Sequence, residues 1–266
     1  MSRKHVLVTG MSGLIGTALR GRIDDKHDLS ALNRRDVPGV RCHRADITDL
    51  DAIQPAFEGQ DVVVHLAGVP RNQAGWDEIL PHNVIGTQNV FEAARRAGVR
   101  RIVFASTNLV VGGWEREMPW RALVEGRYDE VAEPWPMLTA ETPVRPTGWY
   151  ACAKVFGEAL ARYHADAHGM SALCVRMGRV IDADRPQIAR EFCVWCSQRD
   201  VAQILDRCID APDDLRFDIF YALSDNRRGF HDLTHAREVL GYEPEDAAED
   251  WREQHPIRKP GMRGNG

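Results

Sequence analysis

Lysine is scarce in this 266-residue chain, where only four of the 34 lysine and arginine residues are lysines. Arginine is a planar, permanently charged group, whereas lysine is a compact charge whose pKa responds to its surroundings. A lysine in a chain that otherwise uses arginine is therefore a candidate for a specific chemical role. Lys154 is such a candidate, because Tyr150 lies four residues before it.

The chain also lacks long apolar runs and a large excess of charge of one sign. A membrane-spanning helix needs about 20 consecutive apolar residues, and the sequence has no such run. The formal net charge of -5 gives no electrostatic reason to expect nucleic acid or a membrane surface as a partner. The apolar segment His5–Val8 begins a strand at once, so we expect no signal peptide and a cytoplasmic location.

Cysteine and histidine give no pattern of a disulfide framework or a metal site. The six cysteines lie mostly in apolar segments, which favours reduced thiols in a core. Cys193 and Cys196 have the spacing of half a zinc site, but no second pair accompanies them, and we interpret them as packing. His164 and His168 lack the glutamate that a metalloprotease helix needs after its first histidine, so we expect a solvated helix face and no metal.

Continuous apolar strand segments alternate with amphipathic helical patterns along most of the chain. This alternation predicts a parallel sheet covered by helices on both faces, that is, an α/β fold. The length suits one large domain with a full core. The expected strands are 5–8, 29–32, 40–45, 61–66, 101–105 and 172–177, and the expected helices are 14–23, 49–57, 76–97 and 149–168.

Residues 112–147 interrupt this alternation with a long irregular insertion. The insertion holds three tryptophans (Trp114, Trp120 and Trp135) and five prolines. A loop of this length in a compact domain is usually functional. The alternative is a packed excursion in which each tryptophan only buries apolar area, and the sequence leaves both interpretations open. The polar segment 251–266 is expected to be a mobile tail.

A glycine-rich turn directly follows the first expected strand. Gly10, Gly13 and Gly16 stand three residues apart and lead into the helix expected at 14–23. Glycines in this place permit a tight turn, close approach of the backbone to a ligand and close helix–strand packing. The unpaired N–H groups at the start of the helix suit a pyrophosphate. In this context the motif predicts a dinucleotide site.

Tyr150 and Lys154 share one face of the helix expected at 149–168, because they are four residues apart. From the numbers of tyrosines and lysines, only roughly 0.08 pairs of this spacing are expected by chance. Taken alone, the pair has two readings. Either the phenol packs and the ammonium is solvated, or the two groups converge on one reacting centre.

Taken together and in this order, these segments resemble the extended short-chain dehydrogenase/reductases, which include the NAD-dependent epimerase/dehydratase family. The chain is similar over nearly its whole length, above all to short members that oxidise free sugars, uronate dehydrogenase and the archaeal NAD-dependent glucose-6-phosphate dehydrogenase. The motifs are the glycine turn, Asp46-Ile47, His65-Leu-Ala-Gly68, Ala105-Ser-Thr-Asn108, Tyr150-x-x-x-Lys154, Arg145–Tyr150, Val175–Gly178, Leu223–Asn226 and Leu240–Pro244.

The resemblance implies a Rossmann-type doubly wound sheet with a small C-terminal substrate-binding portion. It implies one NAD(P)-binding domain over 1–266, with substrate-binding elements within 112–147 and 179–250. Tyr150 is implied to be the catalytic base and Thr107 to bind the reacting oxygen. Lys154 is implied to anchor the ribose and to favour the phenolate, since a free tyrosine has a pKa near 10. The other implied cofactor-binding residues are Gly10, Gly13, Leu14, Ile15, Gly16, Asn33, Arg34, Asp46, Ile47, Leu66, Ala67 and Gly68.

The substrate side departs from the uronate pattern. Asn108 matches a substrate-contacting asparagine and Arg190 the arginine that holds the substrate carboxylate. However, Leu109 replaces a histidine, and Pro70 replaces a serine, so that Pro70 with Arg71 is more similar to the sugar-phosphate enzyme. Arg71 and Arg190 could clamp a carboxylate or phosphate with paired hydrogen bonds. The alternative for each arginine is an ordinary surface residue.

The end of the second expected strand bears on the choice of cofactor. NAD enzymes place an acidic residue there to bind the ribose 2′-hydroxyl. This chain has neutral Asn33 followed by Arg34 and Arg35, which can pair with a 2′-phosphate. We therefore expect NADP, with NAD bound beside Asn33 as the alternative.

The expected activity is oxidation of the anomeric hydroxyl of a sugar, uronic acid or sugar phosphate to a lactone, by a homo-oligomeric enzyme with a small-molecule substrate. One alternative is a nucleotide-sugar epimerase or dehydratase. Only about 90 residues follow the last expected strand, and Asn108 is neutral where dehydratases carry an acid. The other alternative is a non-catalytic NAD(P)-sensing regulator, which would not need to keep Thr107, Tyr150 and Lys154.

Overall fold

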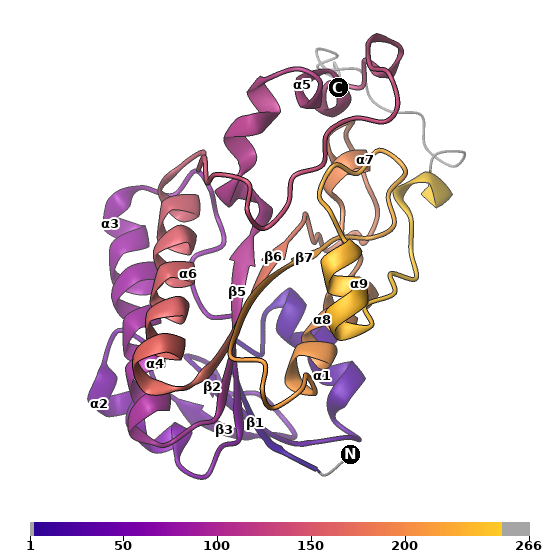
Figure 1. Cartoon of the computed structure of the whole chain (residues 1–266). Coiled ribbons are helices and arrows are strands. Elements are labelled where there is room, and N and C mark those ends of the chain that lie inside the picture. The colour runs from indigo at the N-terminus through magenta and orange to yellow at the C-terminus, as the bar shows by residue number, and fades with distance from the viewer. Residues whose placement is uncertain (1–2, 252–266) are drawn as a thin grey trace, which may run out of the picture.

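A parallel sheet of seven strands forms the centre of the computed structural model, which describes residues 3–251 (Figure 1). The strands are β1 (His5–Thr9), β2 (Asp28–Asn33), β3 (Arg41–Arg44), β4 (Val62–His65), β5 (Arg101–Thr107), β6 (Ser171–Met177) and β7 (Phe217–Ala222). Their order in space is β3-β2-β1-β4-β5-β6-β7. The order reverses between β1 and β4, and ligands of such sheets bind at the carboxyl ends of the strands beside this point. The predicted Rossmann-type α/β fold is confirmed.

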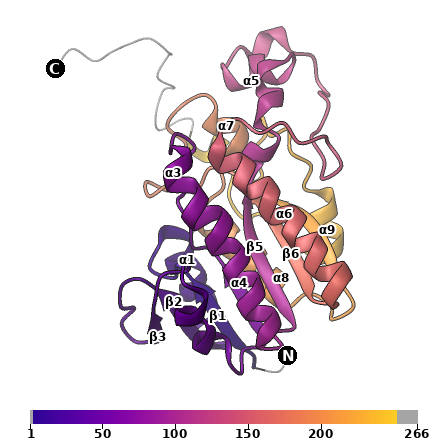
Figure 2. The ribbon, with the colours of Figure 1, turned by 90° about the vertical axis from the view of Figure 1, so that its left-hand side faces the viewer.

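Helices cover both faces of the sheet. On one face α4 (Gly86–Arg96) and α6 (Trp149–His168) run side by side, as Figure 2 shows. On the other face α1 (Leu14–Ile23) packs against α8 (Gln198–Ile209). The shorter helices are α2 (Leu50–Ile53), α3 (Trp76–Ile79), α5 (Trp120–Val124), α7 (Glu191–Val194) and α9 (Thr234–Leu240), and 3₁₀ turns lie at Gln54–Phe57, Asn108–Val110, Gly112–Arg116, Tyr128–Glu130 and Ala248–Trp251.

Each central strand contributes side chains to two separate cores, because successive residues of a strand point to opposite faces. In β1, Val6 and Val8 pack into the core under α1 and α8, and Leu7 packs into the core under α4 and α6. Phe104 of β5 lies in the second core, against Phe91 of α4. Burial on both faces explains why these strands read as continuous apolar runs.

The helices expected at 14–23 and 149–168 have the predicted bounds. The helix expected at 76–97 is instead divided into α3, a π-helical segment (Leu80–Ile85) and α4. Pro81 stands near the start of the π-helical segment, and its missing N–H removes an α-helical hydrogen bond. The pattern after residue 177 predicted no element, and there the structure has α7, α8, β7 and α9.

The insertion 112–147 is held in place largely by its tryptophans. Each indole N–H donates to a backbone carbonyl: Trp114 to Pro143 at 3.0 Å, Trp120 to Pro136 at 2.9 Å, and Trp135 to Gly229 at 2.9 Å. All three rings pack on an apolar cluster that includes Val110 and Phe230. The tryptophans therefore pack the insertion against itself and against the segment after β7.

Two smaller expectations can be compared with the structure. His164 is buried against Phe91, so the expected solvated face at His164 and His168 is wrong for the first histidine. All six cysteines lie in the described part of the chain and are free thiols, and both Cys193 and Cys196 are buried.

The tail expected to be mobile lies, from residue 252 on, outside the described residues. Within 3–251, every helix falls short of the length and apolarity that crossing a membrane requires.

Two buried histidines predict a loss of stability in mild acid. Burial, with the charge of Lys154 nearby, lowers the pKa of His65 to about 3. Burial, with the charges of Arg190 and Arg176, lowers the pKa of His231 to about 3. Below about pH 6.5 the unfolded chain gains protons that the folded chain cannot accept. The free energy of unfolding should thus fall between pH 7.5 and 5, by about 2 kcal/mol for each histidine.

Urea unfolding at pH 7.5 and pH 5 measures this loss. His231→Gln should remove about half of the loss that the two histidines cause, whereas His5→Gln, at an exposed position, should leave it unchanged. An equal loss in His231→Gln and the parent protein would contradict the assignment.

Candidate active site

The glycine-rich turn after β1 lies directly against the turn after β4. Gly10 has a φ of 73°, and a Cβ on it would lie 3.0 Å from the backbone of Ala67. A Cβ on Gly16 would lie 2.5 Å from the carbonyl oxygen of Met11. Helix α1 begins after Gly13 without a side-chain cap, so its first N–H groups remain available to an anion. The turn therefore has the shape and donors of a dinucleotide cradle.

A chain of polar contacts holds the two turns together. The Ala67 N–H donates to Thr9 Oγ1 at 3.1 Å, and Thr9 Oγ1 lies 2.8 Å from His65 Nδ1. His65 Nε2 lies 3.2 Å from Thr87 Oγ1. A neutral His65 with its proton on Nε2 satisfies all these contacts. Sequence reasoning missed both threonines: Thr9 is a polar residue at the end of the apolar first strand, and Thr87 gave no signal.

Asn33 lies at the end of β2, as predicted, with Arg34 and Arg35 exposed after it. Its side-chain N–H donates to Ser12 Oγ at 2.6 Å, which joins the strand end to the glycine turn. Its Oδ1 is buried and finds no hydrogen-bond partner among the described residues. An acceptor left open at this edge fits a ribose hydroxyl.

Asp46 and Ile47 follow β3 and are held by two different neighbours. Partial burial raises the pKa of Asp46, but hydrogen bonds from the N–H and hydroxyl of Thr48 outweigh it, and the net shift is downward. Ile47 packs on Gly86, where a Cβ would lie 2.6 Å from Ile47 Cδ1. The Asn89 amide donates to the Ile47 carbonyl at 2.9 Å. Ile47 is thus placed by α4, whereas Asp46 is placed by its own turn.

Thr107, Tyr150 and Lys154 come together at the carboxyl end of β5. Thr107 is the last residue of that strand and hydrogen-bonds the Tyr150 side chain. The Lys154 ammonium lies 5.7 Å from the centre of the Tyr150 ring and 4.8 Å from that of Phe104. The predicted convergence of the phenol and ammonium is therefore present.

Burial shifts the pKa values of Tyr150 and Lys154 in opposite directions, and each shift favours the neutral form of the group. Burial raises the pKa of Tyr150 to about 12, although the hydrogen bond with Thr107 opposes the rise. Burial lowers the pKa of Lys154 to about 8, and Cys174 and Glu158 oppose the fall. In the chain by itself, Lys154 does not achieve the expected lowering of the Tyr150 pKa, because desolvation of the phenolate dominates.

A buried ion pair lies behind Lys154. Glu158, one helical turn further along α6, accepts hydrogen bonds from Arg176 Nε at 2.9 Å and Nη2 at 2.8 Å. The Ser106 hydroxyl donates to the same carboxylate at 2.6 Å, and Arg176 Nη1 also contacts the Tyr221 hydroxyl at 3.1 Å. The Glu158 charge favours the ammonium form of Lys154. Sequence reasoning missed this pair, although Lys154 and Glu158 have the same four-residue spacing as Tyr150 and Lys154.

The predicted substrate residues are placed differently from one another. Asn108 is buried beside Thr107, and its Nδ2 has no hydrogen-bond partner within 3–251. Arg71 is exposed and pairs with Glu78 of α3. Arg190 forms a bidentate pair with Glu115, with Nε to Oε2 at 2.6 Å and Nη2 to Oε1 at 2.7 Å. Both arginines expected to clamp an anion are thus engaged by carboxylates of the chain itself.

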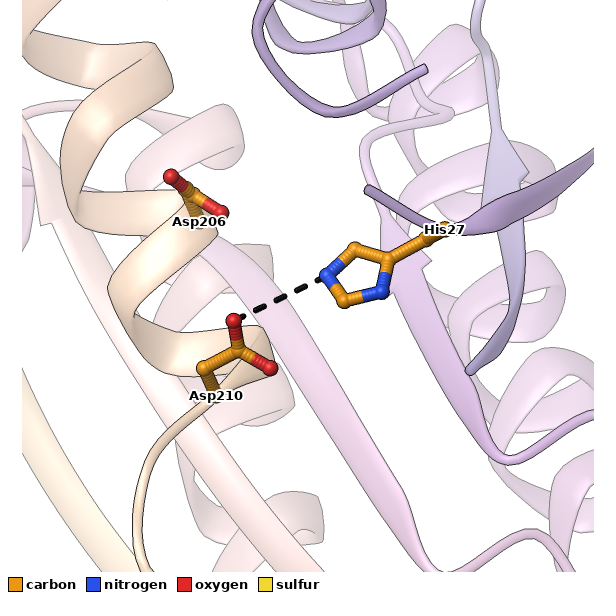
Figure 3. A group of neighbouring side chains, drawn as sticks. All are labelled: His27, Asp206 and Asp210. Atoms are coloured by element: carbon orange, nitrogen blue, oxygen red, sulfur yellow. Dashed lines mark ion pairs between the residues drawn. The ribbon is translucent and has the colours of Figure 1, made fainter. Parts of the chain in front are cut away.

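A group of metal-ligand type lies at the opposite edge of the sheet. In the described part of the chain, His27, Asp206 and Asp210 bring ligand-type atoms within 4.8 Å of one another (Figure 3). Each carboxylate already pairs with basic side chains, so the group offers no net negative charge to a divalent cation. We interpret it as an ion-pair cluster that fastens α8 to the start of the sheet. The cations are Lys4, Arg22 and Lys26.

A cavity of about 370 Å³ adjoins this cluster. Its arginines serve the fold: Arg100 pairs with Asp61, and Arg101 donates to carbonyls at the end of α8. Arg216 donates to the Gly169 carbonyl. We therefore place the candidate active site at the carboxyl edge of the sheet and not in this cavity.

Comparisons with known proteins agree with this geometry. The model of the NAD dependent epimerase/dehydratase family matches residues 6–188. NAD-dependent glucose-6-phosphate dehydrogenase from Haloferax volcanii is 36% identical over 95% of this chain and 97% of its own. L-arabinose 1-dehydrogenase (NAD(P)(+)) from the same organism is 34% identical over 91% of this chain and 96% of its own. A mutant uronate dehydrogenase from Agrobacterium tumefaciens, solved with NAD, superposes with a TM-score of 0.82 at 30% identity, covering 98% and 93% of the two chains.

Proposed function

The chain belongs to the NAD-dependent epimerase/dehydratase family, and from this premise we propose that it is an NAD(P)-dependent dehydrogenase that oxidises the anomeric hydroxyl of a sugar to a lactone. The observation that carries the proposal is the meeting of Thr107, Tyr150 and Lys154 at the carboxyl edge of the sheet, the edge at which the glycine turn also lies. Relatives named as dehydrogenases of a sugar phosphate and of a free sugar support the sugar substrate.

The reaction needs one proton and one hydride to leave the same alcohol. When bound, the oxidised nicotinamide accepts the hydride and adds a positive charge beside the site. The Thr107 hydroxyl orients the substrate oxygen, and the Tyr150 oxygen receives its proton. Lys154 stays mostly protonated at neutral pH, because its pKa is lowered only to about 8, and its charge favours the phenolate.

The residues present fit a dinucleotide along the carboxyl edge. The cradle of Gly10, Gly13 and Gly16 has no room for side chains and offers helix N–H groups, and Leu14 and Ile15 open that helix. We propose NADP as the preferred cofactor within this NAD-dependent family. Arg34 is exposed beside a neutral Asn33, which suits a 2′-phosphate. NAD is the alternative. The turn Leu66, Ala67 and Gly68 faces the cradle across the Gly10 contact.

The insertion 112–147 and the segment 179–250 form the substrate side of the single domain in this proposal. The Glu115–Arg190 pair and the bond from Trp135 to the Gly229 carbonyl join these two segments. The alternatives have less support. A dehydratase would need an acid where Asn108 stands, and a sensing regulator would have no use for the assembled catalytic groups.

The assembly is proposed to be a homo-oligomer, formed through the outer face of α6. Trp149, Phe156 and Tyr163 are exposed along this helix, with 53%, 37% and 57% of their surface accessible. Their spacing of seven residues puts them on one stripe, and exposed apolar stripes mark association surfaces. The reduced cysteines agree with the cytoplasmic location, which stays a prediction.

Tyr150→Phe should remove the base and leave cofactor binding nearly intact. The loss of a proton-transfer group lowers kcat by about 10²–10⁴-fold, which the absorbance of reduced cofactor measures. Tyr163→Phe, at an exposed tyrosine of the same helix, should keep the parent rate. A kcat for Tyr150→Phe within a few fold of the parent value would remove Tyr150 from this role.

Arg34→Ala tests the choice of cofactor. Loss of a charge-assisted hydrogen bond should weaken NADP binding by about 1.5–3 kcal/mol, roughly ten- to hundredfold, and spare NAD. Arg35→Ala tests the neighbour in the same way, and Arg41→Ala, exposed at the start of β3, serves as the control. Titration of both cofactors by fluorescence gives the affinities. Equal weakening of NAD and NADP, or no change in either, would count against the 2′-phosphate contact.

Phe156→Glu should disrupt the proposed association, because it places a charge in the apolar stripe of α6. Light scattering coupled to size-exclusion chromatography should show a smaller species than the parent protein forms. Arg207→Glu puts the same charge on α8, on the other face of the sheet, and should keep the parent mass. A parent protein that is already monomeric would overturn the assembly.

A further inference from the structure

We propose that Glu115 forms with Arg190 the ion pair that an acidic substrate would otherwise form. The substrate is therefore an uncharged sugar. This inference rests on the proposed dehydrogenase function and narrows its substrate class. It contrasts with the anion clamp that Arg71 and Arg190 predict from the sequence.

The pair has the geometry with which an arginine recognises a carboxylate. Two parallel hydrogen bonds join the Nε and Nη2 edge of Arg190 to the two oxygens of Glu115, at 2.6 and 2.7 Å. An arginine binds a substrate carboxylate or phosphate with a bidentate pair of the same kind. The Glu115 side chain is only 14% exposed and that of Arg190 27%. An anion that displaced Glu115 would leave its carboxylate partly buried and unpaired, which is strongly unfavourable.

The position of the pair puts it on the substrate side of the catalytic groups. Glu115 lies in the 3₁₀ turn Gly112–Arg116, a few residues beyond Asn108. Arg190 stands at the start of α7, on the connection that leaves β6. The ends of β5 and β6 are adjacent, with Thr107 opposite Met177 in the register. The two partners therefore approach the carboxyl edge from adjacent strand ends.

The more buried cations around the pair are already neutralised by carboxylates of the chain. Arg176 pairs with Glu158, and Arg228 pairs with Glu133. Arg179 lies 3.5 Å from Glu191 on the same connection. His231 stays neutral near pH 7, because burial and the charges of Arg190 and Arg176 lower its pKa to about 3. The buried cations of this region are thus neutralised before any substrate binds.

Two of the polar atoms that remain open on this side of the molecule belong to uncharged groups. Asn108 Nδ2 and His231 Nδ1 are buried and have no hydrogen-bond partner in the described part of the chain. Neutral donors and acceptors of this kind match sugar hydroxyls, which both donate and accept. A substrate hydroxyl can also hydrogen-bond the outer edge of the Glu115–Arg190 pair without breaking it.

The test compares sugars that share a ring and differ only in an anionic group. D-galactose against D-galacturonate, and D-glucose against D-glucuronate and glucose 6-phosphate, are assayed with NAD and NADP. In the parent protein, kcat/KM for the neutral sugar should exceed that for its acidic partner at least tenfold. Glu115→Gln removes the charge and keeps the shape, so the acid-to-neutral ratio should rise by ten- to hundredfold, through a lower KM for the acid.

Two further variants make the result decisive. Glu117→Gln removes the charge of an exposed glutamate two residues away and should leave the ratio unchanged. Glu115→Gln combined with Arg190→Gln avoids a buried unpaired guanidinium, so it tests the inference even where the single variant does not fold. Its ratio should fall between those of the parent and Glu115→Gln.

The outcomes distinguish a wrong substrate class from a wrong proposed function. A parent protein that prefers the acidic sugars, or variants at Glu115 whose acid-to-neutral ratio stays at the parent value, would overturn the inference and leave the dehydrogenase standing. A parent protein that binds the cofactor but oxidises neither neutral nor acidic sugars would overturn the proposed function as well.

Discussion

The close contact between the turns that follow β1 and β4 is the constraint on which the candidate site depends. Gly10 meets the backbone of Ala67 so closely that no side chain fits between them. Thr9 and His65 tie the same two turns together by hydrogen bonds. Because β1 and β4 flank the reversal in strand order, this contact forms the floor of the proposed cofactor site. The proposed catalytic residues lie on β5 and α6, beside that floor.

Buried charge pairs determine the electrostatics around that floor. Glu158 and Arg176 neutralise each other behind Lys154, so the ammonium has a negative charge one turn away without an unpaired carboxylate in the core. Glu115 and Arg190 do the same on the substrate side. Removing one partner from such a pair is far more costly than removing both. In the proposed site, the positive charge available to a substrate depends on which cations the protein has already paired with its own carboxylates.

The insertion illustrates how a structural role and a chemical role combine. Its tryptophans anchor it through indole N–H bonds and apolar packing, as the packed interpretation requires. That anchoring holds the turn from which Glu115 reaches Arg190, 75 residues further along the chain. The tryptophans thus help to position this turn, and the proposed selectivity depends on the Glu115 carboxylate that the turn carries.

The sequence by itself determined the parallel α/β sheet, the bounds of α1 and α6, the glycine turn and the pairing of Tyr150 with Lys154. These features depend on local periodicity, strand burial and four-residue spacing, which residues close in sequence express directly. Only the tertiary structure decided that Arg190 is paired with Glu115 and that burial raises the Tyr150 pKa. It also decided that β7 forms a seventh strand at the edge of the sheet and that α8 covers one face. Partner choice and desolvation arise between segments far apart in the chain, so no local pattern carries them.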